Sequence, residues 1–239
     1  MSFVFASMGT MISLAGDLPS GTPEAITDAF AELDERFSLH RPGSEADRIA
    51  TRELRMTRAS AEMRAAYDLA LTWRSDTDGA FTPHRPDGVI DLNGVVKAMA
   101  IQRAGDLLDE AGSTYWSVNA GGDALTRTAP GRRPWVVGVV DPFDRNRLLT
   151  QLRATDAHPA VTTSGIAERG EHIWRIGAGD TFCQVTVAGP DIMTADVLAT
   201  AILAGGRPTL ELATRRWPVE VIAVTHDGGL YATPVFRAA

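Results

Sequence analysis

Apolar residues in the first part of the chain recur mostly at helical spacing. This spacing predicts helices over residues 22–37, 60–74 and 96–108. The first of these helices begins at a Thr-Pro-Glu sequence, which places proline in the first turn, where its missing N–H costs nothing. Residues 3–14 are rich in Phe, Val, Ile and Met and predict strand structure that is interrupted at residues 8–10.

The rest of the chain is dominated by runs of β-branched and aromatic residues. Such runs predict strands over residues 89–93, 115–119, 134–140, 160–164, 173–176, 182–188, 219–224 and 230–235. Helices are predicted at 194–205 and 208–215. Clustered strands with segregated helices are typical of an α+β layer architecture. We expect one domain over residues 1–239, made of two intimate subdomains, because no repeat and no linker composition divides the chain.

Composition narrows the functional classes. The 239 residues include 23 basic and 30 acidic ones, and this acidic balance disfavours nucleic acid and anionic lipid as partners. Cys183 is the only cysteine, so no intramolecular disulfide or thiolate metal cluster can form, and we expect a buried side chain. The sequence shows neither a secretion signal nor a run of about 20 apolar residues. We therefore expect a cytoplasmic location without membrane insertion.

A segment with an acid and a hydroxyl, Ala195-Asp196-Val197-Leu198-Ala199-Thr200, carries the most chemical information. In a helix, Asp196 and Thr200 would share one face. Their all-oxygen chemistry suits a hard cation such as Mg²⁺. On this segment alone, a half-site for magnesium and a solvated surface helix are equally good interpretations.

Three further segments place glycine next to polar residues. Asn119-Ala120-Gly121-Gly122-Asp123 follows a predicted strand, and its glycines allow backbone N–H groups to approach a phosphate, although a plain tight turn explains them as well. In Asp78-Gly79-Ala80-Phe81, the phenylalanine either flanks an aromatic ligand or fills the core. In Asp91-Leu92-Asn93-Gly94-Val95-Val96-Lys97, the lysine suits a phosphate and the acid suits a base or ring, although a surface ion pair explains the two charges as well. None of these segments is a Rossmann G-x-G-x-x-G or a Walker sequence.

The order of these segments resembles the ApbE family of FAD:protein FMN transferases. The resemblance covers nearly the whole chain and also includes Met8-Gly9-Thr10, Phe37-Ser38 with Ser44, and Thr163-Ser164-Gly165. It implies an α+β protein with a T-fold-like core, mixed or antiparallel sheets and flanking helices. It also implies Mg²⁺-dependent transfer of FMN from FAD to a Thr or Ser hydroxyl of an acceptor flavoprotein, with release of AMP.

The resemblance assigns roles to particular residues. Asp196, Thr200 and the backbone carbonyl of Gly94 would hold the metal. His172, with Asp196, would be catalytic, the imidazole serving as the base that deprotonates the acceptor hydroxyl. The implied FAD-binding residues are Met8, His40, Gly79, Ala80, Phe81, Asp91, Lys97, Ala120, Gly121, Gly122, Asp123, Thr163 and Ser164.

The chain departs from the family pattern around His172. Family members usually have His-Ile-Ile-Asp-Pro-x-Thr-Gly, whereas this chain has His172-Ile173-Trp174-Arg175-Ile176-Gly177-Ala178-Gly179. His40 stands where the family commonly has Tyr, and Ala98 where it has Gly. Two alternatives to transfer therefore remain, an FAD pyrophosphatase and a non-catalytic FAD-binding protein.

Overall fold

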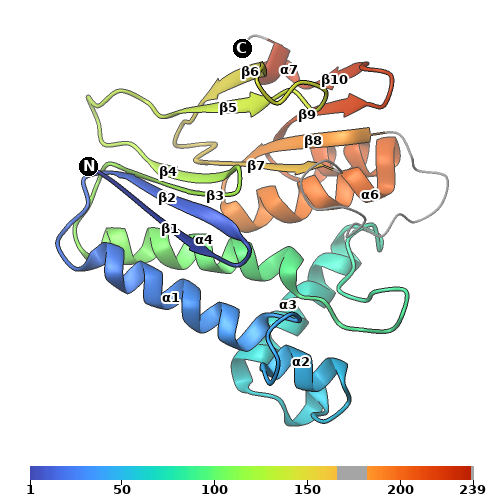
Figure 1. Ribbon diagram of the computed structural model, residues 1–239. Coiled ribbons are helices and arrows are strands. Elements are labelled where there is room, and N and C mark those ends of the chain that lie inside the picture. The colour runs from blue at the N-terminus through green and yellow to red at the C-terminus, as the bar shows by residue number, and fades with distance from the viewer. Residues whose placement is uncertain (166–181, 238–239) are drawn as a thin grey trace.

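The computed structural model describes residues 1–165 and 182–237, and within these ranges eight strands form one antiparallel sheet (Figure 1). Their order across the sheet is β1 (Ser2–Ser7), β2 (Thr10–Gly16), β3 (Trp116–Ala120), β4 (Asp123–Arg127), β7 (Ala160–Gly165), β8 (Phe182–Gly189), β9 (Glu220–Thr225) and β10 (Leu230–Ala232). The predicted interruption at residues 8–10 is the turn between β1 and β2, which pair in register from Ser7 with Thr10 to Ser2 with Ala15.

Helices cover one face of this sheet (Figure 1). They are α1 (Thr22–Phe37), α4 (Asn93–Glu110) and α6 (Ile192–Arg216). The helix α2 (Glu45–Ala50), the 3-10 turn η1 (Met56–Arg58) and α3 (Ala61–Asp76) lie on the side of α1 and α4 that faces away from the sheet. On the opposite face lie the hairpin of β5 (Val136–Val140) and β6 (Leu148–Arg153) and the short helix α7 (Pro234–Arg237). The α+β class predicted from the sequence is confirmed.

Local sequence explains where the main helices begin. The side chain of Ser60 accepts a hydrogen bond from the Met63 amide at the start of α3, and Asp191 accepts one from the Thr194 amide at 2.7 Å at the start of α6. Within α6, Gly206 adopts a non-helical conformation with φ 67° and ψ −150°. Residues 194–205 and 208–215, predicted as two helices, are thus two straight pieces joined at this kink.

Apolar packing fills both sides of the sheet. The largest cluster lies between the sheet and the helices and includes the fully buried Ile12, Phe30 and Leu198. A second cluster, with Phe81 and Val197, packs α1, α3, α4 and α6 together. A smaller outer cluster holds the β5–β6 hairpin against the sheet. Burial of this apolar area is the main force that stabilises the arrangement.

Some boundaries differ from those predicted. The strand predicted over residues 230–235 ends at Ala232, and a short helix begins at Pro234, where proline suits the first turn because its missing N–H is not needed there. Residues 89–93 contain an isolated bridge between Ile90 and His84 instead of a strand. The sequence patterns did not reveal α2, β4 or β6, and the strand predicted over 173–176 lies outside the described residues.

Two expectations from composition can be compared with the fold. Cys183 is buried, as predicted. Among residues 1–165 and 182–237, no helix has both the length and the apolar character that crossing a bilayer requires.

Candidate active site

At one end of the sheet, the β1–β2 turn meets the turn between β3 and β4. The Gly121 amide donates a hydrogen bond to the Met11 carbonyl at 3.2 Å. Gly121 has φ 59°, and a Cβ atom there would lie 2.6 Å from Thr10 Oγ1. Two segments more than 100 residues apart therefore pack in direct contact, and their contact requires glycine at position 121.

The segment after α3 turns back sharply onto the start of α4. Asp78 and Gly79 both have positive φ, and the Phe81 amide donates a hydrogen bond to Thr77 Oγ1 at 3.1 Å. This turn brings the buried Phe81 ring against Gly94, where a Cβ would lie 2.7 Å from the ring. Gly94 therefore allows the first turn of α4 to approach Phe81 closely.

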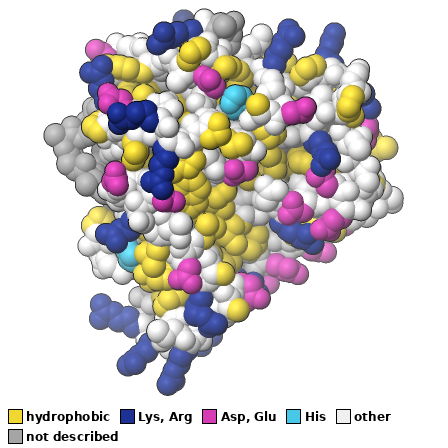
Figure 2. Space-filling view, turned by 180° about the vertical axis from the view of Figure 1, so that it is seen from behind, with side chains coloured by type: hydrophobic (Ala, Val, Ile, Leu, Met, Phe, Trp, Pro, Cys, Tyr) yellow, Lys and Arg dark blue, Asp and Glu magenta, His cyan; other side chains and the backbone are white. Residues whose placement is uncertain are grey.

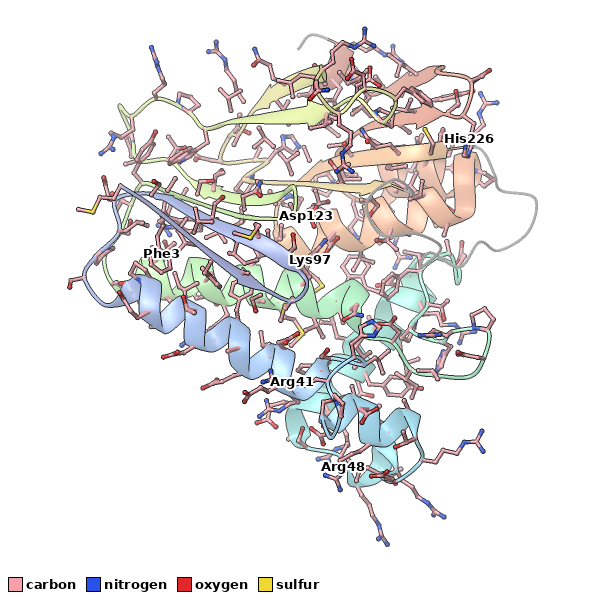
Figure 3. All side chains as sticks on the ribbon, in the orientation of Figure 1. Phe3, Arg41, Arg48, Lys97, Asp123 and His226 are labelled. Carbon is pink, nitrogen blue, oxygen red and sulfur yellow. The ribbon has the colours of Figure 1, made fainter. Side chains whose placement is uncertain are left out.

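A buried cluster of charges joins α4, β4 and α6. The Lys97 ammonium contacts the Asp123 carboxylate and lies 3.5 Å from Asp196 Oδ1. Asp123 is fully buried, and its other oxygen accepts a hydrogen bond from the Thr163 amide of β7 at 2.9 Å. Figure 3 shows Lys97 and Asp123 approaching one another between α4 and the sheet. We call Lys97, Asp123 and Asp196 the charge cluster.

Asp196 and Thr200 both line the same cleft from successive turns of α6. Asp196 is only 4% exposed. The Thr200 hydroxyl lies 3.1 Å from the Ser164 hydroxyl, so β7 supplies a further oxygen at this point. A carboxylate and two hydroxyls thus gather beside the ammonium of Lys97.

The cleft has two lobes. The first has a space of about 1190 Å³, including its open mouth, and is lined by residues of α4, β7 and α6 together with Phe81 and Arg85. The second, of about 1370 Å³ on the same measure, lies between the β1–β2 turn and the loop after α1. His40, Asn93 and Lys97 line both lobes, so the two spaces lie next to one another at these three residues.

The donor set beside Lys97 fits a hard cation. Asp196, Thr200 and Gly94 line one lobe and offer carboxylate, hydroxyl and carbonyl oxygens. The charge cluster holds two carboxylates and one ammonium, and this excess of negative charge favours a cation. Among residues 1–165 and 182–237, no group of three or more His, Cys, Asp or Glu side chains has a metal-binding arrangement. A cation bound here would therefore need further ligands, and substrate phosphates are suitable ones.

Most of the residues implied by the sequence come together around this cleft. Those that line it are Met8, His40, Ala80, Phe81, Asp91, Gly94, Lys97, Gly121, Thr163, Ser164, Asp196 and Thr200. Asp123 lies behind Lys97, Ala120 is buried in the main core, and Gly79 and Gly122 shape the turns beside the lining. His172 lies outside the described residues.

The cleft also contains residues that sequence reasoning missed, among them Arg85. Arg85 belongs to a tight turn, in which its backbone amide donates a hydrogen bond to the Val89 carbonyl at 2.9 Å. The sequence Arg85-Pro86-Asp87-Gly88 is a turn signal, and it would have predicted this small hairpin. The hairpin is attached to α3 by a 2.9 Å hydrogen bond between His84 Nε2 and the Tyr67 hydroxyl, so His84 has a structural role.

A model of the ApbE family matches residues 82–223. This range contains Gly94, the charge cluster and Thr200, and the chain belongs to the ApbE family.

Named relatives and solved structures agree with this membership. The chain is 30% identical over 162 residues to an FAD:protein FMN transferase of Rhodobacter capsulatus, covering 62% of this chain and 30% of that protein. It is 24% identical over 169 residues to the Escherichia coli (strain K12) protein of the same name, covering 64% and 48%. The chain thus spans about half, or less, of the length of these relatives.

Two solved structures of ApbE proteins share this fold. The ApbE protein of Thermotoga maritima superimposes with a TM-score of 0.80 at 19% identity, covering 100% of this chain and 98% of that one. The flavin transferase ApbE of Vibrio cholerae gives a TM-score of 0.79 at 19% identity and the same coverage.

Proposed function

We propose that this protein is an FAD:protein FMN transferase. It transfers FMN from FAD to a Thr or Ser hydroxyl of an acceptor flavoprotein, depends on Mg²⁺ and releases AMP. The observation that carries the proposal is the position of Asp196 and Thr200 on one face of α6, beside the Lys97 ammonium in a two-lobed cleft. Family membership and the names of the relatives support the same activity.

The shape of the cleft suits a dinucleotide. FAD consists of two bulky halves joined by two phosphates, and the two lobes meet at His40, Asn93 and Lys97. A dinucleotide that occupies both lobes places its linking phosphates near this junction. There the Lys97 ammonium attracts the phosphate charge, while Asp123 and Asp196 hold the ammonium in position.

Asp196, Thr200 and the Gly94 carbonyl are the residues that would hold the cation. When bound, Mg²⁺ neutralises charge that develops on the phosphates during transfer. The acceptor hydroxyl oxygen forms a bond to the FMN phosphorus, and the bond from that phosphorus to the AMP oxygen breaks. AMP leaves with the electron pair, and the hydroxyl proton passes to a base. His172 is our candidate for this base from the sequence.

The test measures both products of the reaction. Purified protein is incubated with FAD and Mg²⁺, with and without an acceptor flavoprotein, and AMP and covalently bound flavin are quantified by chromatography and mass spectrometry. We expect AMP and modified acceptor in equal amounts, and neither product after chelation of the metal. AMP together with free FMN would make the protein a pyrophosphatase, and intact bound FAD would make it an FAD-binding protein.

A further inference from the structure

The β5–β6 hairpin has an unusually apolar outer face. Among the residues that the structure describes, nine large hydrophobic side chains are classed as exposed, and four of them belong to this hairpin. They are Val136 at 52%, Val140 at 40%, Phe143 at 61% and Leu148 at 54%. Val140 pairs directly with Leu148, and Leu148 also lies over Gly138, so these side chains line one face. We call Val136, Val140, Phe143 and Leu148 the hairpin patch.

The same hairpin differs in charge from the rest of the chain. Residues 132–153 contain five arginines and two aspartates, whereas the whole chain has 23 basic and 30 acidic residues. The view from behind shows basic side chains along the upper edge of the molecule, the edge that β5, β6 and α7 occupy in Figure 1 (Figure 2). Arg132 pairs with Asp17 and Arg147 with Asp141, and the segment still has more basic than acidic residues. An apolar patch on a basic segment attracts a partner whose surface is apolar and acidic.

The tip of the hairpin has a defined shape. The Phe143 amide donates a hydrogen bond to Asp141 Oδ1 at 2.9 Å, and Arg147 Nε donates one to Asp141 Oδ2 at 3.0 Å. The Arg147 amide also donates to the Asp144 carbonyl at 3.0 Å. These bonds fix the loop around a buried carboxylate, so Phe143 projects from an ordered turn, which lowers the entropy lost when a partner binds.

The tip lies at the cleft end of the sheet. The Gln184 side chain of β8 donates a hydrogen bond to the Val140 carbonyl at 2.9 Å. Gln184 is also the register partner of Gly165 in β7, and Gly165 lines the cleft. A single residue of β8 therefore links the end of β5 to the wall of the candidate active site.

We propose that the hairpin patch and its arginines dock the acceptor flavoprotein, through an acidic surface with an apolar centre. This inference rests on the proposed function. Transfer requires the acceptor hydroxyl to reach a phosphate in the cleft, so the acceptor must cover surface beside the mouth. A membrane or a second copy of the chain bound at the same place would compete with the acceptor for that surface.

The test compares a protein acceptor with a small one. Phe143→Asp puts a charge on the apolar tip of the patch, and Val4→Asp is the matched control, because Val4 is 55% exposed on β1, away from the hairpin. Two acceptors are compared. One is a purified acceptor flavoprotein that the unmodified enzyme labels with FMN, and the other is N-acetylthreonine amide. For Phe143→Asp we expect kcat/KM toward the protein to fall roughly 10- to 30-fold, through KM. Transfer to N-acetylthreonine amide and acceptor-independent AMP release should not change, and Val4→Asp should behave like the unmodified enzyme.

A second variant tests the charge of the hairpin arginines. Arg145→Glu reverses one exposed charge at the tip, and we expect a roughly 3- to 10-fold lower kcat/KM toward the protein acceptor with a weaker dependence on salt. A decrease in kcat/KM that is confined to the protein acceptor and depends on salt supports docking at these arginines. An equal decrease in kcat/KM toward N-acetylthreonine amide would overturn the docking proposal, because it would mean that the substitution alters the cleft.

Other results distinguish the docking proposal from the proposed function. Equal kcat/KM values of Phe143→Asp and the unmodified enzyme toward the protein acceptor would overturn docking and leave transfer intact. Docking is also overturned if Phe143→Asp abolishes a dimer seen by light scattering, or binding to phosphatidylglycerol vesicles, while transfer to the protein is retained. If the unmodified enzyme labels no protein, the transferase proposal fails, and docking fails with it.

Discussion

The charge cluster and the tip of the β5–β6 hairpin both hold an aspartate against a cationic side chain, but they are built differently. Lys97, Asp123 and Asp196 come from three elements, and the side chains of both aspartates are at most 5% exposed. Asp141 and Arg147 are six residues apart in one loop, and the Arg147 side chain is 69% exposed. The first arrangement requires the whole fold, whereas the second depends on a short stretch of chain.

This difference decides which property each ion pair influences. A buried carboxylate loses its hydration, and removal of its partner leaves a charge that the interior solvates poorly. An ion pair with an exposed partner is screened by water and adds little to stability. We therefore expect substitutions in the charge cluster to change both the free energy of unfolding and the proposed reaction. The pair at the hairpin tip mainly sets the local shape of a surface.

Removal of Asp123 should have the largest effect. Asp123→Ala leaves the Lys97 ammonium, whose side chain is 11% exposed, without its contact at Asp123, and also removes the acceptor of the Thr163 amide. We expect a loss of about 3–5 kcal/mol in the free energy of unfolding, measured by urea denaturation. Asp123→Asn retains an oxygen for the Thr163 amide and should lose less. A loss no larger than that of Asp141→Asn would remove the distinction between the two regions.

Two glycines, one in each region, give a smaller and sharper contrast. A Cβ at Gly94 would lie 2.7 Å from the buried Phe81 ring, and one at Gly138 would lie 2.9 Å from the end of the exposed Leu148 side chain. Gly94→Ala should destabilise the protein by roughly 1–2 kcal/mol in thermal unfolding, because the ring has little room to move. Gly138→Ala should be neutral or stabilising, since Leu148 can rotate into solvent and glycine weakens a strand. Equal costs at the two positions would contradict this account of their packing.

The smallest predicted effect concerns Asp141 and pH. The hydrogen bond from Arg147, followed by the one from the Phe143 amide, lowers the pKa of Asp141 below its ordinary value. A lowered pKa in the folded state stabilises the protein above the unfolded-state pKa of about 4, and this contribution disappears as the pH falls through the folded-state pKa. Asp141→Asn should therefore have a slightly lower Tm at pH 7, and the difference should shrink below about pH 4. A difference in Tm that grows on acidification would contradict this assignment.

Periodic patterns predicted the long helices and most strands, because each of these elements buries one regular face. They missed β4, whose first residue is the buried Asp123, and β6, whose bulge near Leu148 breaks the alternation. The helix α2 is too short for a periodic signal, and it is defined by its Ser44 cap, whose side chain accepts from the Asp47 amide. Tertiary contacts, which periodicity does not record, stabilise these three elements.

The candidate site was predictable where its chemistry is local in sequence. Asp196 and Thr200 are four residues apart, so helical geometry alone places them on one face. The contacts of Lys97 with Asp123, and of Gly121 with Thr10, join segments far apart in the chain, so only the order of family motifs suggested that these residues belong together. Arg85 and the hairpin patch belong to none of the motifs that carried the resemblance, and the fold was needed to find them.

The central claim is that Asp196 and Thr200 hold a cation which binds the phosphates of FAD. The most direct measurement is the affinity for FAD, followed by flavin fluorescence with and without Mg²⁺, for the unmodified protein and for Asp196→Asn. We predict that Mg²⁺ tightens FAD binding about 10-fold or more in the unmodified protein and has no effect on the variant. Equal Mg²⁺ dependence in the two proteins would contradict the claim.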